Sequence, residues 1–157
     1  MQPEDRDLLR RLLVDERLLA LGLVVDGEPV VGLLPFAAAE DFSAVYVQAS
    51  ALARHSQGLT PGARFSGVIH RSDNAEADPL QTPRLVLEGV VELLDGQHAE
   101  IEPATRSFLM RFPSAAMTLA LPDFSIYRLE MRGGRLIAGF GRALNLSASQ
   151  FTSLPGE

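Results

Sequence analysis

The chain has 157 residues, no cysteine and a net charge of -6, and 46% of its residues are hydrophobic and 22% charged. A chain of this length is typical of one globular domain, so we expect a single domain over residues 1–157. The negative charge argues against a nucleic-acid partner, which requires a basic stripe. The missing cysteines exclude disulfides and thiolate metal sites. No apolar run reaches the ~20 residues of a membrane helix, and the acidic start is unlike a signal peptide; this suits a cytoplasmic protein without a membrane partner.

The first part of the chain predicts a helix followed by two strands. Leucines at helical spacing indicate an amphipathic helix over residues 3–14. Residues 18–26 and 29–37 are predicted strands, joined by the hairpin signal Asp26-Gly27. The first strand is apolar at nearly every position, so we expect both its faces to be covered, by a helix or by a partner subunit. Gly32 in the second strand allows close approach of another backbone or of a ligand.

The segment from residue 44 to 70 reads as a strand, a short helix at residues 51–57, a turn and a second strand. Ser50 stands where a helix N-cap is expected, since its hydroxyl can accept a bond from a free backbone N–H. Arg54 and His55 follow within one turn. Free N–H groups, a hydroxyl, a guanidinium and an imidazole could together hold a phosphate. The same pattern also fits an N-cap serine followed by two exposed polar residues, and both interpretations stay open.

The second half of the chain predicts further strands and helices. The expected elements are a loop at 71–82, a strand at 84–94 with a bend or bulge at Gly89, a helix at 101–112, a short helix at 114–121, and strands at 124–131 and 135–141. Gly133-Gly134 is the expected hairpin turn between the last two strands, and the polar tail from Asn145 on is expected to be loosely held. About seven strands linked mostly by hairpins, with three or four helices, predict an α+β fold built on a small antiparallel barrel.

Patterns of known catalytic and metal sites are missing from the sequence. The three histidines, His55, His70 and His98, do not have the spacing of a metal site, so no protein metal site is expected. There is no G-x-S-x-G motif of a serine hydrolase, and the hairpin-rich order excludes a dinucleotide fold. Arg142 lies just beyond a glycine-flanked strand end and is either a solvated side chain or an anion contact. Whether the chain is an enzyme stays open.

Four pieces of the sequence carry a family resemblance. They are Asp26-Gly27-Glu28-Pro29 leading into VVGLLPFA, VYVQASALARHSQGL at 45–59, PRLVLEGVV at 83–91 preceded by Asp78-Pro79, and YRLEMRGGRLIAGFGRA at 127–143. Together they resemble the pyridoxamine 5′-phosphate oxidase-like, FMN-binding split-barrel superfamily, and within it the haem-utilisation (HugZ-like) branch. The likeness covers about residues 4–144. It implies a small antiparallel split β-barrel with peripheral helices that pairs as a homodimer.

The resemblance also implies two symmetric FMN sites at the dimer interface, to which both chains contribute. Ser50, Arg54 and His55 match the segment that grips the FMN phosphate; Leu33, Leu34, Pro35, Phe36, Gln48 and Ala49 match strands that line the ribityl chain and the ring; Gln81, Arg84 and Arg142 are expected nearer the rim or from the partner. Haem-degrading members use a C-terminal histidine for the iron, and no histidine follows His98 in this sequence.

The leading interpretation is therefore an FMN-binding, dimeric flavoprotein of the oxidase/reductase type, with an unknown substrate. If FMN binds, its ring carries the redox chemistry, while the protein supplies position and electrostatics. Two alternatives remain. One is a non-catalytic split-barrel binding or sensor module with weak or no flavin, and the other is a haem-binding or haem-degrading protein.

Overall fold

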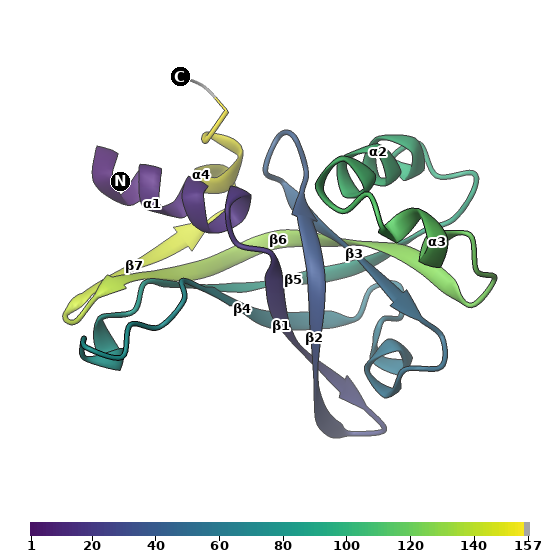
Figure 1. The fold of residues 1–157 in the computed structure, drawn as a ribbon, viewed down its shortest axis with the longest axis horizontal. Coiled ribbons are helices and arrows are strands. Elements are labelled where there is room, and N and C mark those ends of the chain that lie inside the picture. Colours follow the sequence, from purple (N-terminus) through teal and green to yellow (C-terminus); the bar gives the residue numbers. More distant parts are fainter. Residues whose placement is uncertain (156–157) are drawn as a thin grey trace.

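The computed structural model describes residues 1–155, and Figure 1 shows its strands and helices in order along the chain. The elements are α1 (Pro3–Val14), β1 (Leu18–Val25), β2 (Glu28–Ala38), β3 (Ala44–Ser50), the 3-10 helix η1 (Arg54–Gly58), β4 (Arg64–His70), the 3-10 helix η2 (Pro79–Gln81), β5 (Arg84–Leu94), α2 (Ile101–Arg111), α3 (Ala115–Leu119), β6 (Phe124–Gly139), β7 (Arg142–Ser147) and α4 (Ala148–Thr152). Within this part of the chain, no helix has both the length and the apolar character needed to cross a membrane.

The strands form one antiparallel sheet that closes into a barrel. Their order is β3-β2-β1-β4-β5-β6-β7, and β3 also pairs with β6. The closure depends on the length of β6: it pairs with β5 along most of its 16 residues, with β3 through its first half and with β7 through its second half. The α+β split barrel with peripheral helices is therefore confirmed.

Alternation of side chains along the strands fills the inside of the barrel. Every second residue of β1, from Leu19 to Val25, is buried, as expected for a strand with one face in the core. The helix predicted over residues 3–14 is confirmed, and it packs Leu9, Leu12 and Leu13 into the same core. A second apolar cluster lies outside the barrel, where α2 and α3 cover parts of β2, β3 and β6. In Figure 1 these two helices lie over one end of the sheet.

The outer face of β1 and β2 is left uncovered by the rest of residues 1–155. Leu18, Val24, Val31 and Leu33 are 50%, 63%, 71% and 66% exposed. Leu18 and Val24 of β1 lie on the same side of the sheet as Val31 and Leu33 of β2. In the strand register, all four positions and their partners on the opposite strand belong to the same alternating set, which faces outward. We call these four residues the outer β1–β2 face. Of the two expected covers, a helix or a partner subunit, no helix of residues 1–155 lies over these four side chains, and cover by a partner stays a prediction.

The prediction of a hairpin turn at Gly133-Gly134 is wrong, because β6 runs straight through both residues. A Cβ added to Gly134 would lie 2.4 Å from the carbonyl oxygen of Val86 in β5, so glycine here serves close strand packing. The chain instead reverses at Gly139 to Gly141, where both glycines have a positive φ (151° and 74°).

The loosely held tail is also a wrong prediction. Residues 142–147 form β7 against β6, and α4 follows with a capping box between Ser147 and Gln150. Phe151 is fully buried, and Leu154 is 2% exposed within the barrel core. The packed core therefore extends well beyond residue 144.

Candidate functional site

Ser50 does not cap a helix. It is the last residue of β3, and η1 begins only at Arg54, with Ala53 at the N-cap position and no side-chain cap. The Ser50 hydroxyl does accept a backbone bond, from Leu52 N–H at 3.1 Å. It also donates to Asp123 Oδ2 at 2.6 Å. The α-helix predicted over residues 51–57 is therefore replaced by a turn and a five-residue 3-10 helix.

This geometry weakens the phosphate site that the sequence suggested. The Ser50 hydroxyl proton is already bound to a carboxylate, and that negative charge repels a phosphate at the same place. His55 is half-buried and packs against β2, where a Cβ added to Gly32 would lie 2.7 Å from the imidazole ring. The close approach predicted at Gly32 is thus made by this side chain. Arg54 is exposed.

The ring-lining candidates on β2 and β3 divide by strand alternation. Leu34, Phe36 and Ala49 point into the hydrophobic core and are at most 4% exposed, so their side chains face away from any external ligand. Leu33 belongs to the outer β1–β2 face. Pro35 and Gln48 meet at a cavity outside the barrel wall.

This cavity, of about 440 Å³, lies between the first three strands and the helices α2 and α3. We call it the ring cavity. Its lining residues are Arg17, Leu18, Pro35, Gln48, Phe108, Phe112, Ser114, Ala115 and Thr118. The lining combines aliphatic and aromatic side chains with neutral hydrogen-bonding groups and one guanidinium, and no carboxylate of residues 1–155 belongs to it. Such a mixture suits a flat, mostly apolar ligand.

Hydrogen bonds and aromatic contacts fix the walls of the ring cavity. Gln48 Nε2 donates to Thr118 Oγ1 at 2.9 Å. The Thr118 hydroxyl in turn donates to the carbonyl oxygen of Ala115 at 3.0 Å. Phe108 and Phe112 stack as a tilted pair with ring centroids 5.2 Å apart. The Gln48 amide and the Thr118 hydroxyl are therefore bonded to each other, and the rings of Phe108 and Phe112 form an apolar wall.

Two guanidinium groups flank one of these rings. The Cζ atom of Arg17 lies 5.3 Å from the Phe112 centroid, and that of Arg111 lies 5.7 Å from the same centroid. Arg111 donates to the carbonyl oxygens of Val14 and Glu16. Burial, together with the positive charge of Arg17, lowers the pKa of Arg111. Arg17 therefore places one guanidinium in the cavity lining, and Arg111 lies behind the same ring under the influence of Asp15 and Glu16.

Sequence reasoning missed Arg17 and the whole contribution of α2 and α3. Arg17 stands among ordinary charged residues before a strand, and no spacing distinguishes it. Phe108 and Phe112 fall within the helix predicted over residues 101–112, and both belong to the second apolar cluster. Only the packing of that helix on β2 and β3 shows that their rings also border a cavity.

Gln81, Arg84 and Arg142 lie elsewhere in the chain, around η2 and the β6–β7 turn. Gln81 Oε1 accepts the N–H of Phe140 at 3.1 Å, and Arg84 Nη1 donates to the Thr82 carbonyl oxygen. Arg142 forms an ion pair with Asp5 at 2.8 Å. In Figure 1 the β6–β7 turn lies at the left end of the molecule, while η1, in blue, lies in its right half. One chain therefore does not bring these three residues to the ring cavity.

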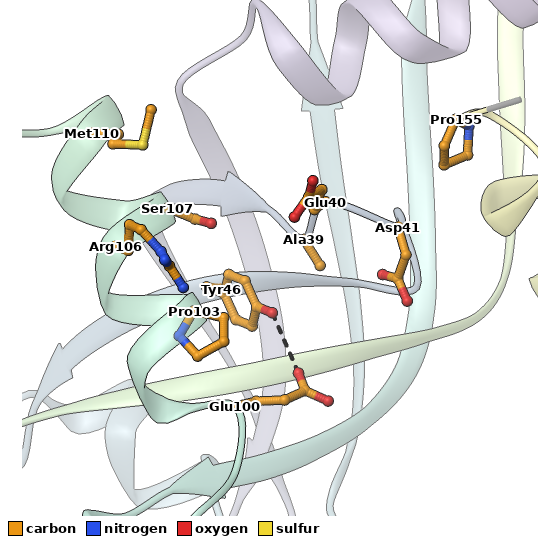
Figure 2. A pocket seen from close by; sticks show the side chains of 10 residues that line it. All are labelled: Ala39, Glu40, Asp41, Tyr46, Glu100, Pro103, Arg106, Ser107, Met110 and Pro155. Atoms are coloured by element: carbon orange, nitrogen blue, oxygen red, sulfur yellow. Dashed lines mark hydrogen bonds between the residues drawn. The ribbon is translucent and has the colours of Figure 1, made fainter. Parts of the chain in front are cut away.

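A larger cavity of about 810 Å³ lies on the other side of α2, next to the β2–β3 turn (Figure 2). Tyr46 donates to Glu100 Oε2 at 3.3 Å there, and Arg128 Nε donates to the same oxygen at 3.0 Å. Burial, and then the charge of Glu100, raise the pKa of Tyr46 to about 12. The carboxylates of Glu40 and Asp41 also line this cavity. Residues 1–155 contain no cluster of three metal-ligating side chains, here or elsewhere.

No protein-family model matches the chain, and no curated protein matches it. Solved structures do. The chain is 24% identical to a haem-binding protein from Mycobacterium smegmatis, with a TM-score of 0.83 over 98% of this chain and 62% of that protein. It is 22% identical to HutZ, the haem storage protein of Vibrio cholerae, with a TM-score of 0.71 over 88% of this chain and 94% of HutZ. A further structure is 30% identical, with a TM-score of 0.78 over 96% of this chain and 97% of its own length.

The same fold extends to a protein from Clostridium acetobutylicum described as of the pyridoxinephosphate oxidase family, 11% identical with a TM-score of 0.66 over 96% of this chain and 99% of its own. The chain therefore has the split-barrel fold that these structures share. Its structural neighbours include proteins of the haem (HugZ-like) branch. The chain spans less than two thirds of the length of the M. smegmatis protein.

Proposed function

We propose that this chain is a haem-binding protein, and that haem binds in the ring cavity. The observation that carries the proposal is the cavity lining: apolar and aromatic walls, neutral hydrogen-bonding groups, a guanidinium and no carboxylate. Haem is a flat, apolar ring with two carboxylate arms, so it matches this lining in polarity and charge. The proposal is supported by two neighbours of the same fold, described as a haem-binding protein and a haem storage protein.

The lining of the ring cavity offers contacts to the haem ring and to its carboxylate arms, but it offers no histidine ligand to the iron. None of the three histidines lines this cavity. The chain would hold haem through ring contacts with Phe112 and Pro35 and through hydrogen bonds from Gln48 or Ser114. Bound haem would supply iron-centred ligand binding and electron transfer. Binding or storage is the role that we propose for the bound haem.

A second copy of the chain would complete the site. Four large aliphatic side chains on the outer β1–β2 face are at least half exposed, and a contiguous patch of this kind is typical of an interaction surface. Leu18 belongs both to this face and to the ring cavity. Two copies that pair through the face in a symmetric dimer would therefore cover the cavity mouth as well.

FMN is the second candidate ligand. Pro35 and Gln48, which the family resemblance assigns to the ring of FMN, both line the ring cavity. The phosphate segment fits less well, because the Ser50 hydroxyl is bound to Asp123 and η1 begins three residues late. Haem, which carries no phosphate, does not depend on that segment.

The test is titration of the purified chain with haemin and with FMN, followed by visible absorbance. We expect a Soret band that saturates with haemin. The variant Ser114→Trp should abolish it, because Ser114 lines the cavity and is exposed, so the indole fills the space without disturbing the core. Ala116→Trp, on the exposed side of α3, is the matched control and should bind normally. Unchanged haemin binding by Ser114→Trp, or saturable binding of FMN alone, would overturn the haem proposal.

A further inference from the structure

Arg17 is held in place at the edge of the ring cavity by its backbone and by its side chain. Its carbonyl oxygen accepts the N–H of Phe36 at 3.2 Å, which fixes the entry into β1. Its guanidinium lies over the Phe112 ring, with Cζ 5.3 Å from the centroid. Cation–π contact restricts the side chain, so less conformational entropy is lost when the guanidinium binds a ligand group.

The charges around Arg17 favour an anion. Within residues 1–155 Arg17 forms no ion pair, although two acidic residues stand just before it. Those residues, Asp15 and Glu16, face Arg71 at 3.9 and 3.6 Å. Arg111 adds a second positive charge beside the same phenyl ring. Asp15 and Glu16 also act on the charge of Arg111, but neither lines the cavity, and among residues 1–155 no carboxylate lines it beside Arg17.

We infer that Arg17 binds the negatively charged arm of the ring ligand, and that the cavity therefore selects anionic over neutral ring compounds. The arm is a carboxylate in haem and a phosphate in FMN. The inference rests on the proposed ring-binding function and goes beyond it by naming the residue that determines charge specificity. A guanidinium offers paired N–H donors that match carboxylate and phosphate oxygens, and charge-assisted bonds of this kind are the strong ones.

The experiment compares charged and neutral forms of the same ring. Dissociation constants are measured for haemin and haemin dimethyl ester, and for FMN and riboflavin. The proteins are the unmodified chain, Arg17→Gln, Arg17→Lys and the control Arg10→Gln, an exposed arginine on α1. For the ring that the chain binds, Arg17→Gln should weaken the affinity for the charged compound by about 10- to 100-fold. This is the effect of one lost charged hydrogen bond.

The affinity for the neutral compound should change by less than about twofold, because its ring contacts with the cavity remain. Arg17→Lys should recover part of the loss through its charge, and Arg10→Gln should match the unmodified chain. If Arg17→Gln weakens the binding of haemin but not of its dimethyl ester, Arg17 binds a carboxylate arm. If it weakens the binding of FMN but not of riboflavin, Arg17 binds a phosphate arm. Equal weakening of both forms would show that Arg17 only shapes the cavity and would overturn the inference. Failure of the unmodified chain to bind any of the four compounds would overturn the proposed function itself.

Discussion

The contact between Gly32 and His55 shows how one residue determines the packing of η1 on the barrel. Gly32 lies in the middle of β2, opposite the fully buried Leu21, and has no side chain to separate the strand from the imidazole. The sequence allowed a close approach at this glycine. It could not show that His55, a proposed phosphate contact, makes that approach, because the two residues are 23 positions apart and meet only in the folded chain.

Gly32→Ala should therefore destabilise the fold. The new Cβ would lie 2.7 Å from the imidazole ring, and such overpacking typically costs ~1–3 kcal/mol. Urea unfolding measures the loss, and Gly96→Ala, where a Cβ meets nothing within 4 Å, is the control. In the background of His55→Ala most of the cost should disappear. Equal destabilisation by Gly32→Ala with and without the imidazole would show that this contact is not its cause.

Tyr46 gives the structure a pH dependence at alkaline pH. Burial and Glu100 raise its pKa to about 12 from an ordinary value near 10. The folded state therefore holds the phenol proton more tightly than the unfolded state does. The resulting stabilisation is complete below about pH 10 and is lost as the pH rises toward about 12.

Tyr46→Phe should remove this dependence. The difference in unfolding free energy between the unmodified chain and Tyr46→Phe should shrink as the pH rises above about 10. Denaturant unfolding at a series of pH values measures that difference. A difference that stays constant up to about pH 12 would show that Tyr46 has an ordinary pKa in the folded state.

At the scale of elements, local patterns predicted most of the structure. The helix at 3–14, the hairpin at Asp26-Gly27 and the long strand bent at Gly89 are all confirmed, because each depends on neighbours in sequence. The end of the chain was not predictable in this way. In the sequence, Gly133-Gly134 looks like a hairpin turn. Only the close packing of β6 against Val86 of β5 explains why glycine stands within a strand there.

The C-terminal elements are part of the core, so Phe151→Ala should be strongly destabilising. The ring is fully buried and lies close to Gly134 of β6, and deletion of a buried phenyl group typically costs ~3–5 kcal/mol. Thr152→Ala, at the next and exposed position, should change stability by less than about 0.5 kcal/mol. Chemical denaturation of both variants provides the measurement. Similar stabilities would mean that α4 does not contribute to the barrel core.

At the scale of the whole molecule, the outer β1–β2 face is the feature that a single chain leaves incomplete. The replacement of Val31 and Leu33 by glutamate should convert a dimer into a monomer, because charges buried in an apolar interface are costly. Size-exclusion chromatography with light scattering gives the mass. Met117→Glu, on an equally exposed apolar residue of α3, should leave the dimer intact. A monomeric unmodified chain would show that this face has another partner.

The candidate site could be predicted only in part. The family resemblance assigned Pro35 and Gln48 to the ring of the ligand, and both line the ring cavity. Arg17, Phe112 and Thr118 could not be found, since they reach the ring cavity through the packing of α2 and α3 and the entry into β1. The expected grouping of Ser50 with a helix start failed because β3 continues through that residue.

The central proposal is that two copies of the chain pair through the outer β1–β2 face and hold haem beside it. Native mass spectrometry of the full chain with haemin tests both parts in one measurement. The proposed function predicts a species of two chains with two haem groups, and the loss of haem from Ser114→Trp with the pairing unchanged. A single chain that carries haem, or a pair that takes up none, would contradict it.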